Sequence, residues 1–475
     1  MPPQSRREFL GSSCCAAVGY VGLLSALSNL RLMGAIAGPG NVPARAAATS
    51  DYRALVCLFL NGGNDANNLI VPIGPGAATD PGSYAAYAAA RSNLALPQTG
   101  LLPITPNTTD GRSWALHAAV PELQSLFNDG KAAILANVGT LVYPITKAQY
   151  TAASVPLPRQ LFSHNDQQVQ WQTSVPDKPS TTGWGGRMAD LSNAFNASNE
   201  ISMSISLSGT NYFQVGRSVS QYAVSTSGAI SFNGNAAATS VDGVRFRAQR
   251  DLFAQTQGNL FDTAFAGITD GAITNADLLN STLSRSPTIT TAFPSNNIGN
   301  QMKMIARLIA AAPNLGLKRQ VFFVQLGGWD THAAQLTNAT PTSGAHANLL
   351  TQVGQAVNAF YNATIELGIP EQVTTFTSSD FGRTYRSNGD GSDHGWGNHQ
   401  FIIGGAVKGR EIYGRMPTLT VNGPDDTGQG RWIPTTSVDE YAATLATWFG
   451  VSPTDLSVVL PNIGRFAKTD LGFLA

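Results

Sequence analysis

The chain has 475 residues and a formal net charge of zero; 43% of its residues are apolar and only 12% are charged. This length accommodates one large domain with insertions, or two domains, around a sizeable core. A chain without net positive charge has no field that attracts nucleic acid or anionic lipid, so neither is expected as a partner.

The first 48 residues are expected to be an export signal and not part of the fold. The pair Arg6 and Arg7 is followed by the apolar Phe9, as in twin-arginine signals. A short apolar segment and an A-x-A type cleavage site near Ala46 come next. We therefore expect a periplasmic or secreted protein. No later apolar run is long enough for a transmembrane span.

Cysteine usage also separates the predicted signal from the mature chain. Cys14 and Cys15 fall within the signal, and Cys57 is the single remaining cysteine. An intramolecular disulfide is therefore excluded after cleavage, although the destination is oxidising.

Near-continuous apolar runs predict strands buried on both faces, which is typical of a parallel sheet. A helical pattern at residues 117–128 joins two of these runs, which predicts an α/β fold with a mostly parallel central sheet flanked by helices. Residues 200–300 are rich in Ser, Asn and Gly and are expected to form an insertion or cap, with a helix over 246–265. The predicted strands cover residues 52–60, 132–138, 319–326, 373–377 and 401–403.

Two early loops carry candidate site residues. Asp65 follows the first predicted strand and is either a metal ligand or part of an ordinary turn. Ser163 and His164 precede a helix, where the serine is either a cap or a nucleophile beside an imidazole. Arg187, at the next helix, is a candidate anion-binding residue.

Two later loops carry the types of side chain that bind metals. Asp330 and His332 follow one predicted strand, and Asp380, His394 and His399 follow another. Such oxygen and nitrogen donors favour zinc, with calcium, magnesium or manganese as alternatives. The oxygen-rich segment 388–393 also resembles part of a calcium loop, but its spacing matches no complete loop.

Besides the twin-arginine start, the chain has four distinctive motifs: LNGGND (60–65), QLGGWDTH (325–332), SDFGRT (379–384) and DHGWGNH (393–399). These features resemble those of the exported proteins grouped as domain of unknown function 1501, a branch of the alkaline phosphatase and sulfatase superfamily. The resemblance covers nearly the whole mature chain except the insertion. It implies an alkaline-phosphatase-like fold with metals at the carboxyl ends of the strands.

The resemblance also implies roles for individual residues. Asp65 takes the place of the early aspartate, unless Asn61 occupies it, and Ser163 that of the nucleophile. Asp330 and His332 resemble one metal site, with His394 or His399 as its third ligand.

Asp380 resembles a ligand of a second metal site. Phe381 follows it where a histidine is expected, which favours one metal site over two.

Two functions follow from this inventory. The first is an exported metal-dependent hydrolase of phosphate or sulfate esters, whose substrate is a small anionic ester. The alternative is a non-enzymatic exported protein that keeps the fold for binding or assembly to an extracellular partner.

Overall fold

The structure is a computed structural model that describes residues 51–197, 200–230, 239–255, 258–337 and 340–475. The predicted export signal, residues 1–48, lies outside the described residues. The strands are β1 (Arg53–Asn61), β2 (Ile70–Pro72), β3 (Leu102–Ile104), β4 (Trp114–Leu116), β5 (Ala132–Gly139), β6 (Ser204–Ser206), β7 (Tyr222–Ser225), β8 (Gly228–Ala229), β9 (Arg319–Gly327), β10 (Val373–Ser379), β11 (Asn398–Gly404), β12 (Ile412–Gly414) and β13 (Thr436–Ser437).

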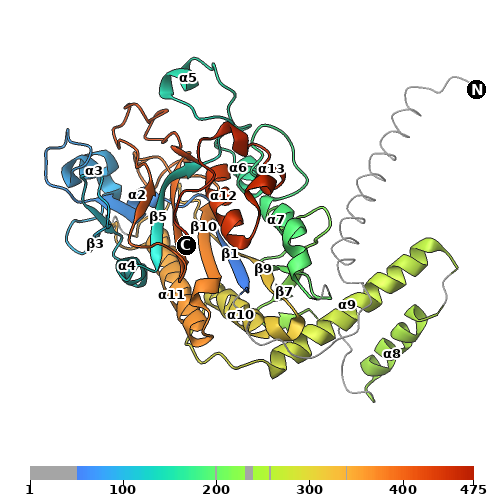
Figure 1. The fold of residues 1–475 in the computed structure, drawn as a ribbon. Coiled ribbons are helices and arrows are strands. Elements are labelled where there is room, and N and C mark those ends of the chain that lie inside the picture. Colours follow the sequence, from blue (N-terminus) through green and yellow to red (C-terminus); the bar gives the residue numbers. More distant parts are fainter. Residues whose placement is uncertain (1–50, 198–199, 231–238, 256–257, 338–339) are drawn as a thin grey trace, which may run out of the picture.

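A ten-stranded sheet forms the centre of the protein (Figure 1), in the order β12-β5-β11-β10-β1-β9-β6-β7-β8, with β13 beside β5. β10, β1, β9 and β6 are parallel neighbours, and β11 runs antiparallel between β10 and β5. The predicted α/β fold with a mostly parallel sheet is therefore confirmed. A separate three-stranded sheet has the order β2-β4-β3.

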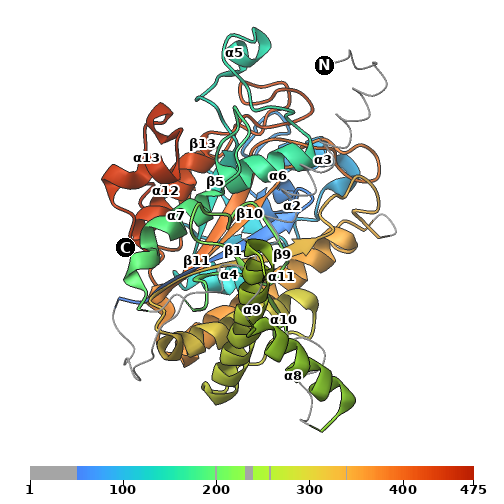
Figure 2. The same cartoon turned by 90° about the vertical axis from the view of Figure 1, so that its right-hand side faces the viewer.

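Helices cover both faces of the central sheet, as Figures 1 and 2 show. The α-helices are α2 (Ala66–Leu69), α3 (Tyr84–Arg91), α4 (Pro121–Asn128), α5 (Lys147–Thr151), α6 (His164–Thr173), α7 (Trp184–Ser192), α8 (Val241–Phe253), α9 (Leu260–Arg285), α10 (Asn297–Ala311), α11 (Ala345–Glu366), α12 (Val438–Phe449) and α13 (Leu456–Val459). Short 3-10 helices are η1 (Ser92–Leu94), η2 (Asn193–Phe195), η3 (Ala312–Leu315), η4 (Pro370–Gln372), η5 (Pro453–Asp455) and η6 (Ile463–Arg465).

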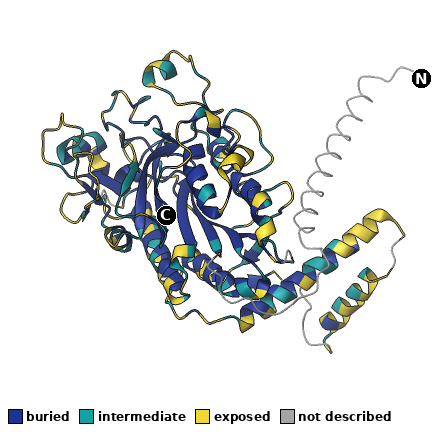
Figure 3. Cartoon of the chain, in the orientation of Figure 1, coloured by how far each residue is buried: buried dark blue, intermediate teal, exposed yellow. Residues whose placement is uncertain are grey.

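The apolar sequence of β1 explains why the sheet is buried on both faces. Successive side chains of a strand point to opposite faces. Val56 and Leu58 join the core beneath α4, α10 and α11, whereas Cys57 and Phe59 join the core beneath α7 and α12. All four side chains are at most 2% exposed, and the buried strands form the dark centre of Figure 3. Two cores therefore sandwich the sheet and hold its strand ends fixed.

The Ser/Asn/Gly-rich region 200–300 is not wholly separate from the sheet. Its strand β6 pairs with β9, and the second half of α9 contributes buried residues such as Leu279 to the core. The single helix expected over 246–265 is wrong: α8 ends at Phe253 and α9 begins at Leu260, where Asn259 caps the new helix by accepting from the Asp262 amide.

α8 and the first half of α9 extend away from the body in Figures 1 and 2. Among the helices of the described residues, none combines the length and the apolar character that a membrane crossing requires.

Candidate metal centre

The carboxyl ends of β1, β9 and β10 lie side by side at one edge of the sheet. Leu60 is in register with both Leu326 and Ser379, so the three chains leave the sheet together. The loop after β1 passes very close to the loop after β9. Gly62 has φ +122°, and a Cβ there would lie 2.5 Å from the amide nitrogen of Asp330. Glycine thus allows the two loops to approach.

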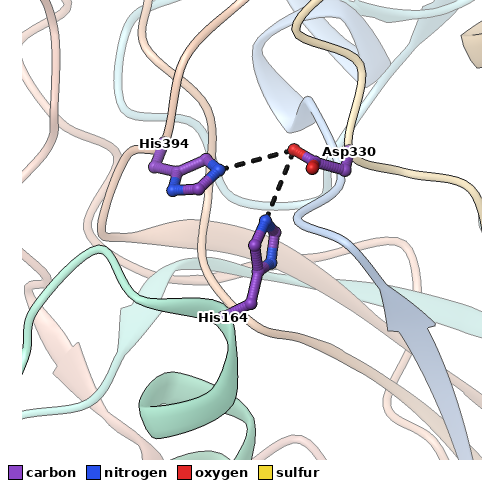
Figure 4. A group of neighbouring side chains, drawn as sticks. All are labelled: His164, Asp330 and His394. Carbon is purple, nitrogen blue, oxygen red and sulfur yellow. Dashed lines mark ion pairs between the residues drawn. The ribbon is translucent and has the colours of Figure 1, made fainter.

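Three side chains converge at this edge: His164 from the start of α6, Asp330 from the loop after β9, and His394 from the loop between β10 and β11 (Figure 4). Their possible ligand atoms all lie within 4.8 Å of one another. The Nε2 atoms of His164 and His394 are each 3.4 Å from Asp330 Oδ1. Ligand atoms around a tetrahedral zinc ion are about 3.3 Å apart, given bonds of about 2.0–2.1 Å. The two separations of 3.4 Å therefore match those between ligand atoms that share one zinc ion.

Each of these imidazoles is anchored through its other nitrogen. His164 Nδ1 lies 2.7 Å from Asp380 Oδ2, and His394 Nδ1 lies 2.7 Å from the carbonyl oxygen of Phe162. Both partners are acceptors, so the ring proton belongs on Nδ1 and the lone pair on Nε2 faces the cluster. Metal-bound histidines are held in this way by carboxylates and backbone carbonyls.

The buried Nε2 of His164 fits a metal ligand. This atom has no hydrogen-bond partner in the described part of the chain. A buried polar atom without a partner costs free energy, which a bound cation would remove. With two imidazole nitrogens and one carboxylate oxygen, the donor set suits zinc.

Asp330 is held by the fully buried Arg383. The guanidinium of Arg383 donates to Asp330 Oδ1 and to the carbonyl oxygens of Gly62, Gly63, Trp329 and Ser392. Partial burial raises the pKa of Asp330, but the hydrogen bond and charge of Arg383 outweigh this effect and lower it to about 2. Asp330 is therefore ionised near neutral pH, which suits a metal ligand.

His332 borders this group. Its Nδ1 is 3.0 Å from Asp393 Oδ1, and its Nε2 is 3.2 Å from Asp330 Oδ1 and 2.7 Å from His394 Nε2. The last separation is that of a hydrogen bond from His332 Nε2 to the lone pair of His394 Nε2, and it is shorter than the separation of about 3.3 Å between two ligands of one zinc ion. His394 can therefore bind a metal only when this hydrogen bond is released. The structure thus brings together three side chains that could hold a metal, with His332 beside them.

The pKa values of His164 and His394 are shifted in opposite directions. The hydrogen bond to Asp380 raises the pKa of His164, against the effect of burial, and the charges of Asp380 and Asp330 add to it. Burial lowers the pKa of His394, against the effect of its bond to the Phe162 carbonyl. The carboxylates thus concentrate negative charge around His164.

Asp380, predicted as a metal ligand, has a different position. It is fully buried, its Oδ1 accepts from the Gly62 amide, and its Oδ2 accepts from His164 and Gln168. With both oxygens occupied, Asp380 orients the ring of His164 and does not join the group of three. Phe381, found where a histidine was expected, packs its ring 4.7 Å from the His164 ring and 4.5 Å from the His394 ring.

The structure does not bring Asp65 or His399 to the cluster, contrary to the expectation from sequence. Asp65 is fully buried in an ion pair with Arg91 and also accepts from Gln335. His399 is buried on β11, where its Nδ1 accepts from the Asn137 amide at 3.0 Å. Burial lowers the pKa of His399 to about 3. Both residues therefore satisfy buried polar groups within the fold and do not face the cluster.

The remaining predicted residues also serve local structure. Ser163 Oγ donates to Asp166 at 2.7 Å, at the start of α6. Arg187 is buried and donates to the carbonyl oxygens of Thr173, Thr182 and Val459, which leaves it unsuited to a substrate anion. Asn61 Oδ1 accepts from Gln168.

The oxygen-rich segment 388–393 is closed by its own hydrogen bonds. Asn388 Oδ1 accepts from the amides of Asp390 and Gly391, and Asn388 Nδ2 donates to Asp393.

The sequence-based predictions did not point to two residues that support the cluster: Phe162, whose carbonyl anchors His394, and Arg383, which holds Asp330. The motif SDFGRT, which contains Arg383, was the available signal for the second of these.

Comparison with known proteins identifies the family. The family described as "Protein of unknown function (DUF1501)" matches residues 52–457. The chain belongs to this family. The match includes all the residues of the cluster. No curated protein matches the sequence.

Several solved structures are similar to this chain at low identity. The C-terminal periplasmic domain of EcEptC from Escherichia coli, in complex with Zn, is 12% identical with a TM-score of 0.35, covering 87% of this chain and 88% of that one. The soluble domain of lipooligosaccharide phosphoethanolamine transferase A from Neisseria meningitidis is 9% identical with a TM-score of 0.34, covering 88% and 95%. The PsFucS1 sulfatase from Pseudoalteromonas sp. is 11% identical with a TM-score of 0.33, covering 84% and 68%.

Proposed function

We propose that this protein is an exported metal-dependent hydrolase of phosphate or sulfate esters, with one zinc ion held by His164, Asp330 and His394. The observation that carries the proposal is the pair of imidazoles, each anchored through Nδ1, whose Nε2 atoms lie 3.4 Å from the same carboxylate oxygen. This arrangement has the chemistry and spacing of a metal centre, and it lies where parallel sheets place their ligands.

The charge of the site supports a divalent cation. The carboxylates of Asp330, Asp380 and Asp393 surround the imidazoles, and Arg383 is the cation that pairs with one of them. Two negative charges are left over, which matches the charge of one divalent ion. Burial makes such a balance necessary, because uncompensated charges at a partly buried site are costly.

Three protein ligands leave a fourth position open, as in catalytic zinc sites. His164, Asp330 and His394 would hold the cation, and the chemistry that it would supply is polarisation of an ester oxygen and activation of a water. Asp330 is 47% exposed and His394 is 23% exposed, so an ester can reach the site from solvent. The Ser163 hydroxyl donates a hydrogen bond to Asp166 and not to a residue of the cluster, so water is favoured over this serine as the nucleophile.

Hydrolysis of p-nitrophenyl phosphate and p-nitrophenyl sulfate by the zinc-loaded protein tests this proposal. We expect activity with at least one ester, loss on chelation and recovery with zinc. His164→Ala is expected to abolish it, whereas Asn165→Ala, a change at the exposed neighbouring residue, is expected to have no effect. Activity that survives in His164→Ala would refute the assignment.

The alternative function is an exported protein for binding or assembly. His332 Nε2 lies 3.2 Å from Asp330 Oδ1, and a shift of this ring away from His394 would make it a fourth ligand and close the site, as in structural zinc sites. Loss of zinc in His332→Ala, with no hydrolysis by the wild type, would support this alternative. The projecting helices α8 and α9 also expose large apolar side chains, namely Val241, Val244, Leu252, Leu260, Phe261 and Phe265.

Export and domain organisation belong to the same proposal. Residues 1–48 are proposed to be a twin-arginine signal, and residues 49–475 one domain with an insertion near 200–300. Replacing Arg6 and Arg7 by lysine is expected to keep the precursor inside the cell, and N-terminal sequencing of the exported protein is expected to begin near Ala48. Unchanged export of the double variant would contradict the route.

A further inference from the structure

Arg431 lies at the edge of the metal centre. Its Nε donates to the carbonyl oxygen of His394 at 2.8 Å, and its guanidinium carbon lies 5.2 Å from the centre of the Phe162 ring. Phe162 is also the residue whose carbonyl anchors His394. Arg431 therefore contacts both the ligand loop and the chain that orients the ligand.

The backbone of Arg431 is held rigidly. The buried carboxylate of Asp426 accepts from the amides of Gly428, Gly430 and Arg431 through its Oδ1. Gly430 has φ +77°, and a Cβ at this position would lie 2.2 Å from the Cβ of Tyr385. Such a backbone leaves little conformational entropy to lose when the side chain binds a ligand.

The terminal nitrogens of Arg431 are unused. Within the part of the chain that the structure describes, neither Nη1 nor Nη2 has a hydrogen-bond partner, and no carboxylate pairs with this guanidinium. Three buried arginines differ from it in this respect. Arg383 and Arg187 donate to backbone carbonyls, and Arg91 donates to Asp65 and to two carbonyls. The side chain of Arg431 is only partly buried and can meet a ligand from solvent.

The charge of Arg431 acts on the same site. Arg431 lies close enough to the Asp393 carboxylate, next to His394, for its charge to act on it. Once a divalent cation balances the carboxylates, Arg431 adds one further positive charge. A site with excess positive charge and two free parallel donors suits a tetrahedral oxyanion.

We propose that Arg431 binds the charged group of the ester substrate, through two hydrogen bonds from Nη1 and Nη2 to phosphate or sulfate oxygens. This inference rests on the proposed hydrolase function, and it moves the anion-binding role from Arg187, which is buried on α7, to Arg431. It makes Arg431 a residue that selects dianionic or monoanionic tetrahedral esters over neutral esters.

The test uses the zinc-loaded protein and titrates inorganic phosphate and inorganic sulfate in separate calorimetric experiments. Arg431→Gln is expected to weaken the preferred anion at least about tenfold, the loss typical of a charged double hydrogen bond. Arg431→Lys keeps the charge without the planar fork and is expected to bind more weakly than wild type and more tightly than Arg431→Gln. The matched control is Arg245→Gln on α8, whose side chain is 77% exposed.

Zinc content is measured on every variant and is expected to be unchanged. Anion affinity that is equal in wild type and Arg431→Gln overturns the inference, as does a wild type that binds neither anion. Loss of zinc in Arg431→Gln also overturns it, because Arg431 would then serve only the His394 loop.

The hydrolase and the anion site fail separately. If the wild type hydrolyses esters, and Arg431→Gln has the same KM and the same inhibition by phosphate and sulfate, the hydrolase function is supported and the anion-binding role of Arg431 is refuted. If the wild type binds phosphate or sulfate through Arg431 but hydrolyses neither p-nitrophenyl ester, the anion site is supported and the hydrolase function is refuted.

Discussion

Asp380→Asn changes one atom type in the buried contact that orients His164. In the wild type the fixed Gly62 amide donates to Oδ1, and His164 and Gln168 donate to Oδ2. The asparagine must keep its oxygen toward Gly62, because a backbone amide can only donate. Its NH2 group then faces His164 Nδ1, which must become an acceptor, so the ring proton moves to Nε2 and blocks the metal.

The expected size of this effect follows from measured losses of such partners. Removing the group that holds a metal-bound histidine typically weakens metal binding about 10- to 100-fold, or about 1.4–2.8 kcal/mol. We expect Asp380→Asn to lie at the upper end, because the wrong tautomer is imposed and not merely permitted.

The assay is competition for zinc between the protein and a chromogenic chelator. Asp166→Asn is the matched control, since it makes the same substitution two residues after His164 at a carboxylate that only accepts from Ser163. An Asp380→Asn protein that is folded and binds zinc within about twofold of wild type would refute the orientation argument.

Three further substitutions separate the fold from the metal centre. His399→Ala is expected to destabilise the protein by about 2–5 kcal/mol in urea unfolding and to keep its zinc, and zinc loss would contradict this. Asp65→Asn leaves Arg91 buried without its counter-charge and is expected to cost about 3–5 kcal/mol with zinc content unchanged; a stable variant would show that the pair contributes little. Burial raises the pKa of Asp439 from 3.8 to about 7, so the folded state keeps a proton that the unfolded chain releases, and stability falls as pH rises through this window. Asp439→Asn is therefore expected to gain up to about 4 kcal/mol relative to wild type on going from acid to about pH 8, and equal pH profiles would contradict the burial argument.

Much of the fold could be predicted from the sequence, because strands buried on both faces need continuous apolar runs. The runs at 52–60, 132–138, 319–326 and 373–377 correspond to β1, β5, β9 and β10. The boundary between α8 and α9 was missed although the sequence carries a signal for it. Residues 254–259 (AQTQGN) are polar, and Gly258 precedes Asn259, which caps α9.

The candidate site was predictable only at the level of loops. Parallel strands bring their carboxyl ends to one edge, and the loops that carry Asp330 and His394 meet His164 there. Sequence spacing does not tell which way a side chain points. Asp65 turns inward because Arg91 and Gln335, which are distant in sequence, fill the interior beside it.

Burial decided the role of His399 as well. Its position after DHGWGN suggested a ligand, but it lies within β11, where the Asn137 amide occupies its Nδ1. The same reasoning explains why Arg431 was missed. Its significance depends on contacts with His394 and Phe162 that no local pattern reveals.

The most direct test of the metal centre is the metal content of the folded, signal-cleaved protein, measured by mass spectrometry together with His164→Ala and Asn165→Ala. We predict about one zinc ion per chain in the wild type and in Asn165→Ala, and little or no zinc in His164→Ala. A folded wild type that takes up no divalent metal, even when zinc is supplied, would contradict the central claim.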